Sequence, residues 1–142
     1  MVVSRQFDCL DRLLQVSSVS PQGANQLPSV HGYGLNAANQ RTRLTLADSS
    51  YWVYQYDSLG QVSSGKRYWA DGIPVAGEQF EYGFDDIGNR TLAKAGGDRA
   101  GANLRSASYT NNTLNQATGR GVPGAVDIPG VATPAECHLY RL

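Results

Sequence analysis

The chain has 142 residues, the length of one ordinary domain, and its 12 basic and 12 acidic residues leave a formal charge of zero. This balance excludes the dense positive charge that attracts nucleic acid or an anionic membrane, and no apolar run reaches the roughly 20 residues of a membrane-spanning helix. Eight Tyr and 16 Gly, against two Lys and one Met, favour turn-rich β structure over helix.

The N-terminal half is expected to contain a loop and two strands. Residues 1–8 have neither the basic segment nor the long apolar stretch of a signal peptide. Residues 17–32 are rich in Ser, Pro, Gln and Gly and are predicted to form a loop. Residues 41–46 alternate between polar and apolar, and residues 51–56 are dense in aromatic and β-branched side chains, so strands are expected there with a turn at residues 47–50.

The C-terminal half continues the same alternation of strands and turns. A returning strand is predicted at residues 61–69, a turn at 70–74 and a half-buried strand at 78–84. Residues 95–101 are expected to form a lengthened flexible loop. Residues 120–142 have little periodicity and are predicted to be an irregular tail.

Aromatic residues alternate with polar ones in the two strongest strands, so they fall on one face of each strand. Cross-strand packing of these rings predicts a stacked, buried face. The alternative is an aromatic platform that stacks on sugars or other ligands. The residues of this predicted face are Phe7, Trp52, Tyr54, Tyr56, Phe80, Tyr82 and Phe84.

A four-residue pattern recurs five times, with Asp or Asn first and Gly, Asn or Asp fourth. The first side chain can accept a hydrogen bond from the backbone two residues on, and the fourth residue tolerates a left-handed backbone. This chemistry is typical of a type I turn that closes a β-hairpin. The third residue is apolar in every copy and is expected to pack back onto a sheet. The predicted turn residues are Asp8, Asn36, Asn39, Asp57, Gly60, Asp85, Gly88, Asn112 and Asn115.

The five copies keep a common register along the chain. The first and third copies are 49 residues apart, as are the second and fourth, and the third and fifth are 55 apart. A unit this small cannot bury its own apolar face and must stack on its neighbours. Residues 1–119 are therefore predicted to form one all-β domain of antiparallel hairpin repeats with open edges.

Two local motifs suggest ligands, and each has a structural explanation. The spacing of Gly60, Gly65 and Lys66 resembles a phosphate-binding loop, but Arg67 replaces the required Ser or Thr and strand surrounds the motif. The oxygens of residues 85–89 resemble a calcium loop without its closing Glu. Turn formation explains the same residues in all copies, so no cofactor or metal is expected.

The sequence predicts no catalytic residue. His31 and His138 are the only histidines; both are expected to be solvent-exposed, and no nucleophile motif accompanies them. Cys9 and Cys137 have no paired zinc-ligand spacing, and two cysteines near opposite ends are not expected to form a disulfide framework. The glycosylation-type triplets that begin at Asn89 and Asn111 are interpreted as coincidental.

The sequences Tyr54-x-Tyr56-Asp57-x-x-Gly60 and Tyr82-x-Phe84-Asp85-x-x-Gly88 resemble the tyrosine-aspartate (YD) repeat, and the chain resembles the bacterial rearrangement-hotspot (RHS) proteins over residues 7–130. The resemblance implies hairpins that join into a shell, which commonly encloses a C-terminal toxin or effector in a secreted or surface-bound protein. The chain lacks the family's paired Asp-Pro motifs. Residues 127–130 hold only one Asp-Ile-Pro-Gly.

The sequence therefore favours a structural segment of an RHS-type shell, with no catalysis of its own. Its expected partners are the remaining repeats of a longer chain and that chain's effector, with neither nucleic acid nor a membrane span. The alternative is a module that binds carbohydrate or a cell surface through exposed aromatics. Open edges and an incompletely covered apolar face predict marginal stability or self-association.

Overall fold

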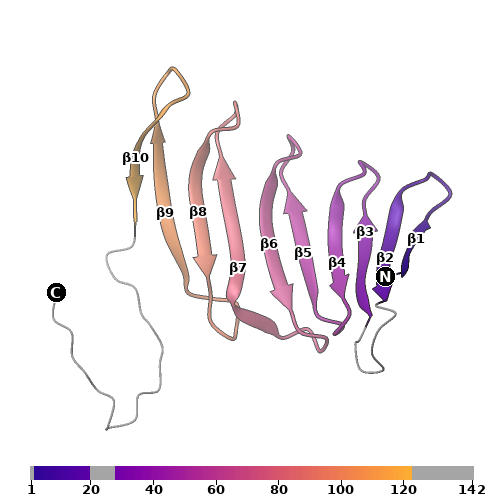
Figure 1. Cartoon of the computed structure of the whole chain (residues 1–142). Coiled ribbons are helices and arrows are strands. Elements are labelled where there is room, and N and C mark those ends of the chain that lie inside the picture. Colours follow the sequence, from indigo (N-terminus) through magenta and orange to yellow (C-terminus); the bar gives the residue numbers. More distant parts are fainter. Residues whose placement is uncertain (1, 20–27, 123–142) are drawn as a thin grey trace, which may run out of the picture.

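The computed structural model describes residues 2–19 and 28–122, which form a single antiparallel sheet of ten strands (Figure 1). The order of the strands in the sheet is their order in the chain. The all-β, open-edged hairpin sheet predicted from the sequence is therefore confirmed. The strands are β1 (Val2–Phe7), β2 (Leu13–Val19), β3 (Ser29–Leu35), β4 (Arg41–Leu46), β5 (Tyr51–Tyr56), β6 (Val62–Tyr68), β7 (Pro74–Phe84), β8 (Arg90–Gly96), β9 (Leu104–Asn111) and β10 (Ala117–Gly121).

Two predicted loops are wrong in part. The predicted loop at residues 17–32 overlaps the end of β2 and the beginning of β3, which pair through Ser17 and Val30. The composition misled here, because small polar residues are tolerated in strands whose two faces both reach solvent. The predicted loop at 95–101 contains the end of β8 and a tight turn.

The predicted C-terminal tail lies mostly outside the described residues. The last strand, β10, ends at Gly121, two residues beyond the predicted end of the repeats at residue 119. The interpretations of Cys137 and His138 concern residues that the structure does not describe. Within the described residues, no helix is long and apolar enough to cross a membrane.

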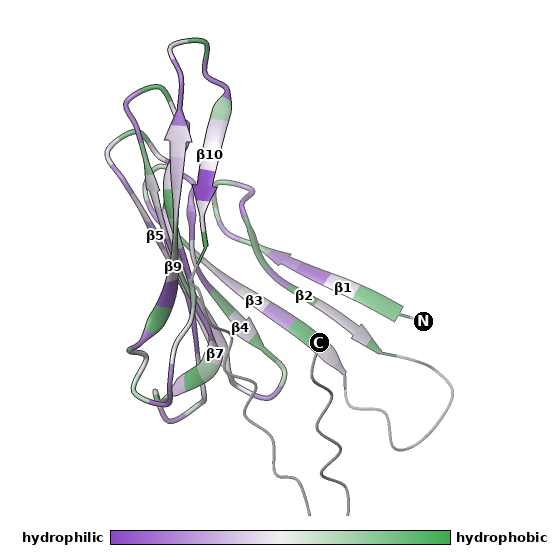
Figure 2. Ribbon diagram, turned by 90° about the vertical axis from the view of Figure 1, so that its left-hand side faces the viewer, coloured by the Kyte–Doolittle hydropathy of each residue, from purple (hydrophilic) through white to green (hydrophobic). Residues whose placement is uncertain are grey.

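The sheet is one layer thick. A 90° turn shows the strands as a single twisted sheet, with no second layer of described residues over either face (Figure 2). Of the apolar side chains in the described residues, only Val75 and Ala107 are buried. Most strand residues are half-buried, because neighbouring strands cover their flanks and solvent reaches their tips. The sheet thus has no hydrophobic core of the usual kind.

The five hairpins that are closed by the turns at residues 8–11, 36–39, 57–60, 85–88 and 112–115 share one irregularity. In each hairpin the pairing skips the residue that lies six positions after the turn's first residue, which produces a β-bulge at the same place every time. The skipped residues are Leu14, Thr42, Ser63, Thr91 and Thr118. The repeat therefore specifies strand twist as well as chain reversal.

The junctions between successive hairpins also share one register. The residue seven positions after one turn's first residue pairs with the residue four positions before the next turn's first residue. The four pairs are Gln15 with Gly32, Arg43 with Val53, Ser64 with Glu81 and Leu92 with Ser108. Successive hairpins are consequently placed by one rule, although the turns are 28, 21, 28 and 27 residues apart.

The most buried large side chain, Gln79, lies where β7 bends away from β6. Its exposed fraction is 1%, and its Nε2 donates hydrogen bonds to the carbonyl oxygens of Arg67 (2.8 Å) and Val75 (3.2 Å). The pairing of β6 with β7 is interrupted here, so these two carbonyls take an amide side chain in place of a strand partner. Gly97 allows the close approach, because a Cβ at that position would lie 3.0 Å from Gln79 Cγ.

Candidate functional surface

The five repeated turns lie along one edge of the sheet, here called the turn edge, at the top of Figure 1. In each turn the Oδ1 of the first residue accepts backbone hydrogen bonds from the residues two and four positions on, at 2.8–3.2 Å. The fourth residue has a positive φ in every copy. These first residues are Asp8, Asn36, Asp57, Asp85 and Asn112, and the fourth are Asp11 (57°), Asn39 (60°), Gly60 (82°), Gly88 (90°) and Asn115 (61°).

These hydrogen bonds stabilise the charged form of the turn carboxylates and so lower their pKa. The backbone N–H of Arg12, with its guanidinium, holds the pKa of Asp8 below the usual 3.8. The side-chain amide of Asn89 holds the pKa of Asp85 below the same value. Both carboxylate oxygens of Asp85 thus accept hydrogen bonds from within the turn, as the turn interpretation of residues 85–89 predicts. The described residues contain no group of three or more His, Cys, Asp and Glu side chains placed to hold a metal.

The opposite edge, here called the linker edge, has turns with the same backbone pattern. Residues 98–101 form a turn of the repeated type, in which Asp98 Oδ1 accepts from the N–H groups of Ala100 (2.9 Å) and Ala102 (3.0 Å). The sequence analysis missed this copy, although it has Asp first, Gly fourth and an apolar third residue. Turns at 46–49 and 69–72 have the acceptor Asp at their third position instead.

The expectation that the third turn residue packs onto the sheet is wrong. Leu10, Leu59, Ile87 and Leu114 are 63–74% exposed, which makes them the most exposed apolar residues along the turn edge. The central residues of a type I turn lie beyond the ends of both strands, so their side chains have no sheet surface beneath them. The turn edge therefore presents a row of apolar tips to solvent.

At three of the four junctions between hairpins, a side chain also joins one turn to the next. The residue four positions after the turn's first residue reaches across to the following hairpin, and this set of contacts is here called the turn-edge ladder. Arg12 Nη1 donates to Asn39 Oδ1 (3.2 Å), and Gln40 Nε2 lies 3.5 Å from the Gly60 carbonyl oxygen. Asn89 Nδ2 donates to Asn115 Oδ1 (3.3 Å). The ladder runs in one direction along the sheet, with donors pointing toward the C-terminal hairpin.

One face of the sheet is aromatic. Tyr54, Gly65 and Phe80 pair in register across β5, β6 and β7, so they share this face. Trp52 stacks on Tyr54 (6.3 Å between centroids) and on Phe80 (6.0 Å). Partial burial here raises the pKa of the Tyr54 phenol. The structure thus brings the predicted aromatics of the central strands into contact.

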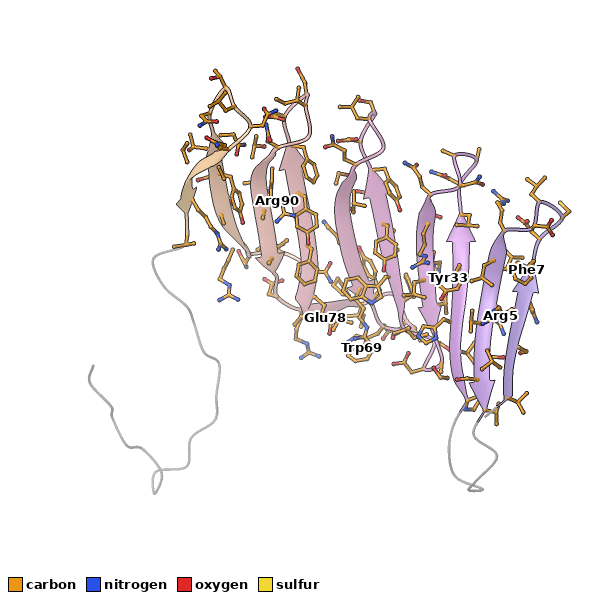
Figure 3. The ribbon with its side chains drawn as sticks, turned by 45° about the horizontal axis from the view of Figure 1, so that its top comes forward. Arg5, Phe7, Tyr33, Trp69, Glu78 and Arg90 are labelled. Atoms are coloured by element: carbon orange, nitrogen blue, oxygen red, sulfur yellow. The ribbon has the colours of Figure 1, made fainter. Side chains whose placement is uncertain are left out.

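The other predicted aromatics have different neighbours. Arg90 lies over the Tyr82 ring at 5.2 Å, and the Tyr56 hydroxyl donates to the Arg41 carbonyl oxygen at 2.7 Å. Phe7 is 54% exposed near the outer edge of the sheet (Figure 3). Phe84 is half-buried on the strand that carries Tyr82. Stacking of arginine on tyrosine replaces ring-on-ring packing away from the centre.

The second face is charged at its centre, which sequence analysis did not predict. Lys66 and Lys94 both contact the Glu81 carboxylate, at 2.6 and 3.2 Å. These three residues come from neighbouring strands β6, β7 and β8. Toward the linker edge, Tyr51 stacks on Tyr68 at 5.4 Å. Since Lys66 is engaged by Glu81 within strand, the phosphate-loop interpretation finds neither its free lysine nor its helix.

Lowering the pH is expected to weaken the sheet partly through Glu81. Hydrogen bonding from Lys66 holds the pKa of Glu81 below its ordinary value of 4.5. A carboxylate whose pKa is lowered by folding stabilises the folded state above its unfolded pKa, and this stabilisation disappears as the pH falls through the folded pKa. Melting temperatures measured from about pH 6 down to about pH 2 should therefore fall less steeply in E81Q than in the wild type. Equal slopes would contradict this assignment.

An arginine cluster joins β6 and β7 to the connection between β4 and β5, near the linker edge. Arg67 donates through Nη1 to both Glu78 oxygens (3.2 and 3.0 Å) and through Nη2 to Ser50 Oγ (3.1 Å). Ser50 is fully buried and donates to Asp48, which holds the pKa of Asp48 below 3.8. Figure 3 shows Glu78 beside Trp69, where β7 bends. These contacts give the cluster a structural role.

The predicted solvent-exposed His31 is half-buried on β3. It lines a hollow of about 250 Å³ with Val30, Leu46 and Asp48. The hollow is open, and Ser29 and Ala47 complete its lining.

Comparisons with known proteins support the fold. No family model matches the chain, and no curated protein matches it. Among solved structures, one chain of the crystal structure of TcdB2-TccC3-Cdc42 is similar, with a TM-score of 0.65 and 16% sequence identity. The similarity covers 81% of this chain but 6% of that chain, so this chain spans a small part of the structure that it matches. At this identity the likeness shows a shared fold.

Proposed function

We propose that this chain is a structural segment of an RHS-type protein, in which its hairpins form part of a β-sheet wall. The proposed wall encloses or presents a C-terminal effector of a longer, secreted or surface-bound protein. The segment itself contributes geometry and contains no catalytic machinery. Its proposed partners are further repeats of the same protein and the enclosed effector.

One observation carries this proposal: the described residues form a single-layer sheet that ends in an unpaired strand on both sides. A sheet of this size normally buries one face against a second layer. Among the residues that the structure describes, only Val75 and Ala107 are buried apolar residues, so this part of the chain gains little from a core of its own. The YD-like sequence repeats and the likeness to part of a much longer chain support the same interpretation.

Extending the chain in both directions tests the scaffold proposal. The coding sequence on either side is expected to encode further units with Asp or Asn first and Gly or Asn fourth. Each added hairpin should raise the melting temperature, because it covers an open edge and adds one junction. Flanking sequence without such units, or a melting temperature that does not change on extension, would contradict the proposal.

The aromatic face favours a second function, recognition of carbohydrate. Trp52 and Tyr54 stay half-exposed on an open face, and Trp69 is 48% exposed. Exposed rings of this kind stack on the apolar faces of sugars. If the chain is a binding module, a glycan array should show reproducible binding that W52A and W69A lose and F7A, on the outermost strand, retains. Binding that all variants share, or none at all, favours the scaffold alone.

A further inference from the structure

We propose that copies of this chain associate head to tail, with β10 of one copy pairing antiparallel against β1 of the next. Both strands are outermost in the sheet, and every residue of each is exposed. Within the described residues, their outer backbone N–H and C=O groups have no strand partner. Such an edge is a template for another strand. The occupant proposed here is a second copy, because the two ends of this sheet are complementary in four respects.

The first respect in which the two ends are complementary is strand direction. Neighbouring strands alternate in direction throughout the sheet. With ten strands, β10 runs opposite to β1. A second copy placed beside β10 in the same orientation therefore continues the antiparallel pattern. It also keeps the five repeated turns of each copy on the turn edge.

The second is register. At all four internal junctions, the residue seven positions after one turn's first residue pairs with the residue four positions before the next. Applied to Asn112 of one copy and Asp8 of the next, this rule pairs Gly119 with Ser4. Arg120 then lies opposite Val3. The junction requires no new geometry, since it repeats one that the chain already forms four times.

The third is the turn-edge ladder. Gln116 Oε1 accepts from Asn112 Nδ2 (3.0 Å), just as Gln40 Oε1 accepts from Asn36 Nδ2 (2.7 Å). The Gln40 amide then points to the next turn. Gln116 repeats this arrangement at the β10 end.

The acceptor at the other end completes the ladder. Asp11 holds the fourth turn position on the β1 side, as Asn39 and Asn115 do in the turns that accept ladder contacts. A copy at β10 would place its Asp11 near Gln116.

The fourth is that neither end complements itself. Antiparallel pairing of β1 with β1, or of β10 with β10, would place the two turn edges at opposite ends of the contact, so no ladder contact could form across it. The association is therefore heterologous. An assembly built from a heterologous contact that does not close into a ring stays open, and it lengthens as the protein concentration rises. We infer open chains of sheets whose mean length rises with protein concentration.

Cysteine trapping tests both the pairing and its register. In a C9S/C137S background, S4C/G119C is expected to give a series of disulfide-linked dimers, trimers and higher species on a non-reducing gel. Gly119 accepts a side chain, since a Cβ there would lie 3.7 Å from Thr110 Oγ1. R5C/G119C is the matched control, because adjacent strand residues point to opposite faces. It should remain monomeric under the same mild oxidation.

The single variants decide the polarity. S4C alone and G119C alone should give no dimer, since the proposed contact joins different residues. Efficient dimers from S4C alone would mean symmetric pairing of β1 and would overturn the proposal. Absence of linked species from S4C/G119C, in protein shown by circular dichroism to be folded, would overturn it as well.

A charge reversal provides a second test, whose salt dependence distinguishes it from association caused by misfolding. In the proposed register Arg5 of one copy lies diagonal to Arg120 of the next, on the same face, so like charges meet across the contact. R5E should tighten association about two- to fivefold at low salt, as seen by sedimentation equilibrium. High salt should remove the difference. Weaker association of R5E would contradict the register.

Discussion

Replacement of Gln79 by alanine is expected to lower the free energy of unfolding by about 2–4 kcal/mol. The substitution removes the amide that donates to the carbonyl oxygens of Arg67 and Val75 and leaves both without that partner in a site that solvent hardly reaches. It also empties the space that Gly97 leaves for the side chain. Urea unfolding followed by tryptophan fluorescence, at low protein concentration, measures the change.

Two further variants separate the causes of this loss. Q79L keeps most of the side-chain volume but cannot donate, so it should remain destabilised if the two hydrogen bonds matter. Q6A removes an exposed glutamine from β1 and should change stability by less than about 0.5 kcal/mol. If Q79A unfolds at the same urea concentration as Q6A, the bend in β7 does not depend on this side chain.

Replacement of Gly60 by valine is expected to destabilise the chain by about 1–3 kcal/mol. Gly60 has a φ of +82°, which a β-branched residue resists, and a Cβ there would lie 3.1 Å from Gln40 Nε2. The variant therefore strains the turn and displaces one contact of the turn-edge ladder. Thermal melting monitored by circular dichroism would report both effects as a lower midpoint.

The chain itself supplies the control for this variant. Asn39 and Asn115 occupy the same turn position with φ near +60°, so G60N should cost much less than G60V. V62A, two residues along on β6 and already 38% exposed, checks for a general sensitivity of this hairpin. Equal melting temperatures for G60V and the wild type would mean that the left-handed turn is not required.

Local chemistry explains why the turns could be predicted and the packing could not. The reversal at residues 57–60 depends on Asp57 and Gly60 alone, so it can be inferred from four letters of sequence. The burial of Gln79 depends on a bend in β7 and on a glycine eighteen residues away in the chain, so no local sequence pattern predicts it. Hydropathy also misled at Leu59, where an apolar side chain lies at a turn tip with no sheet beneath it.

The aromatic face shows the same limit on what local sequence can predict. Alternation correctly placed Trp52, Tyr54 and Phe80 together, because side-chain direction in a strand follows from position. The degree of their burial could not be inferred, since it depends on whether a second layer covers the sheet. Likewise, the contact of Lys66 and Lys94 with Glu81 required knowledge of which strands are neighbours.

The hairpins keep a constant register although they are unequally spaced in the chain. The turn edge and the linker edge therefore differ in how much change in length they tolerate. Every difference in length between successive repeats is taken up at the linker edge, where the connections between hairpins differ in form. Additional peptide introduced there, including an entire inserted domain, would leave the pairing on both sides intact. The linker edge is thus open to insertions, whether evolved or engineered, while the turn edge fixes the register of the hairpins.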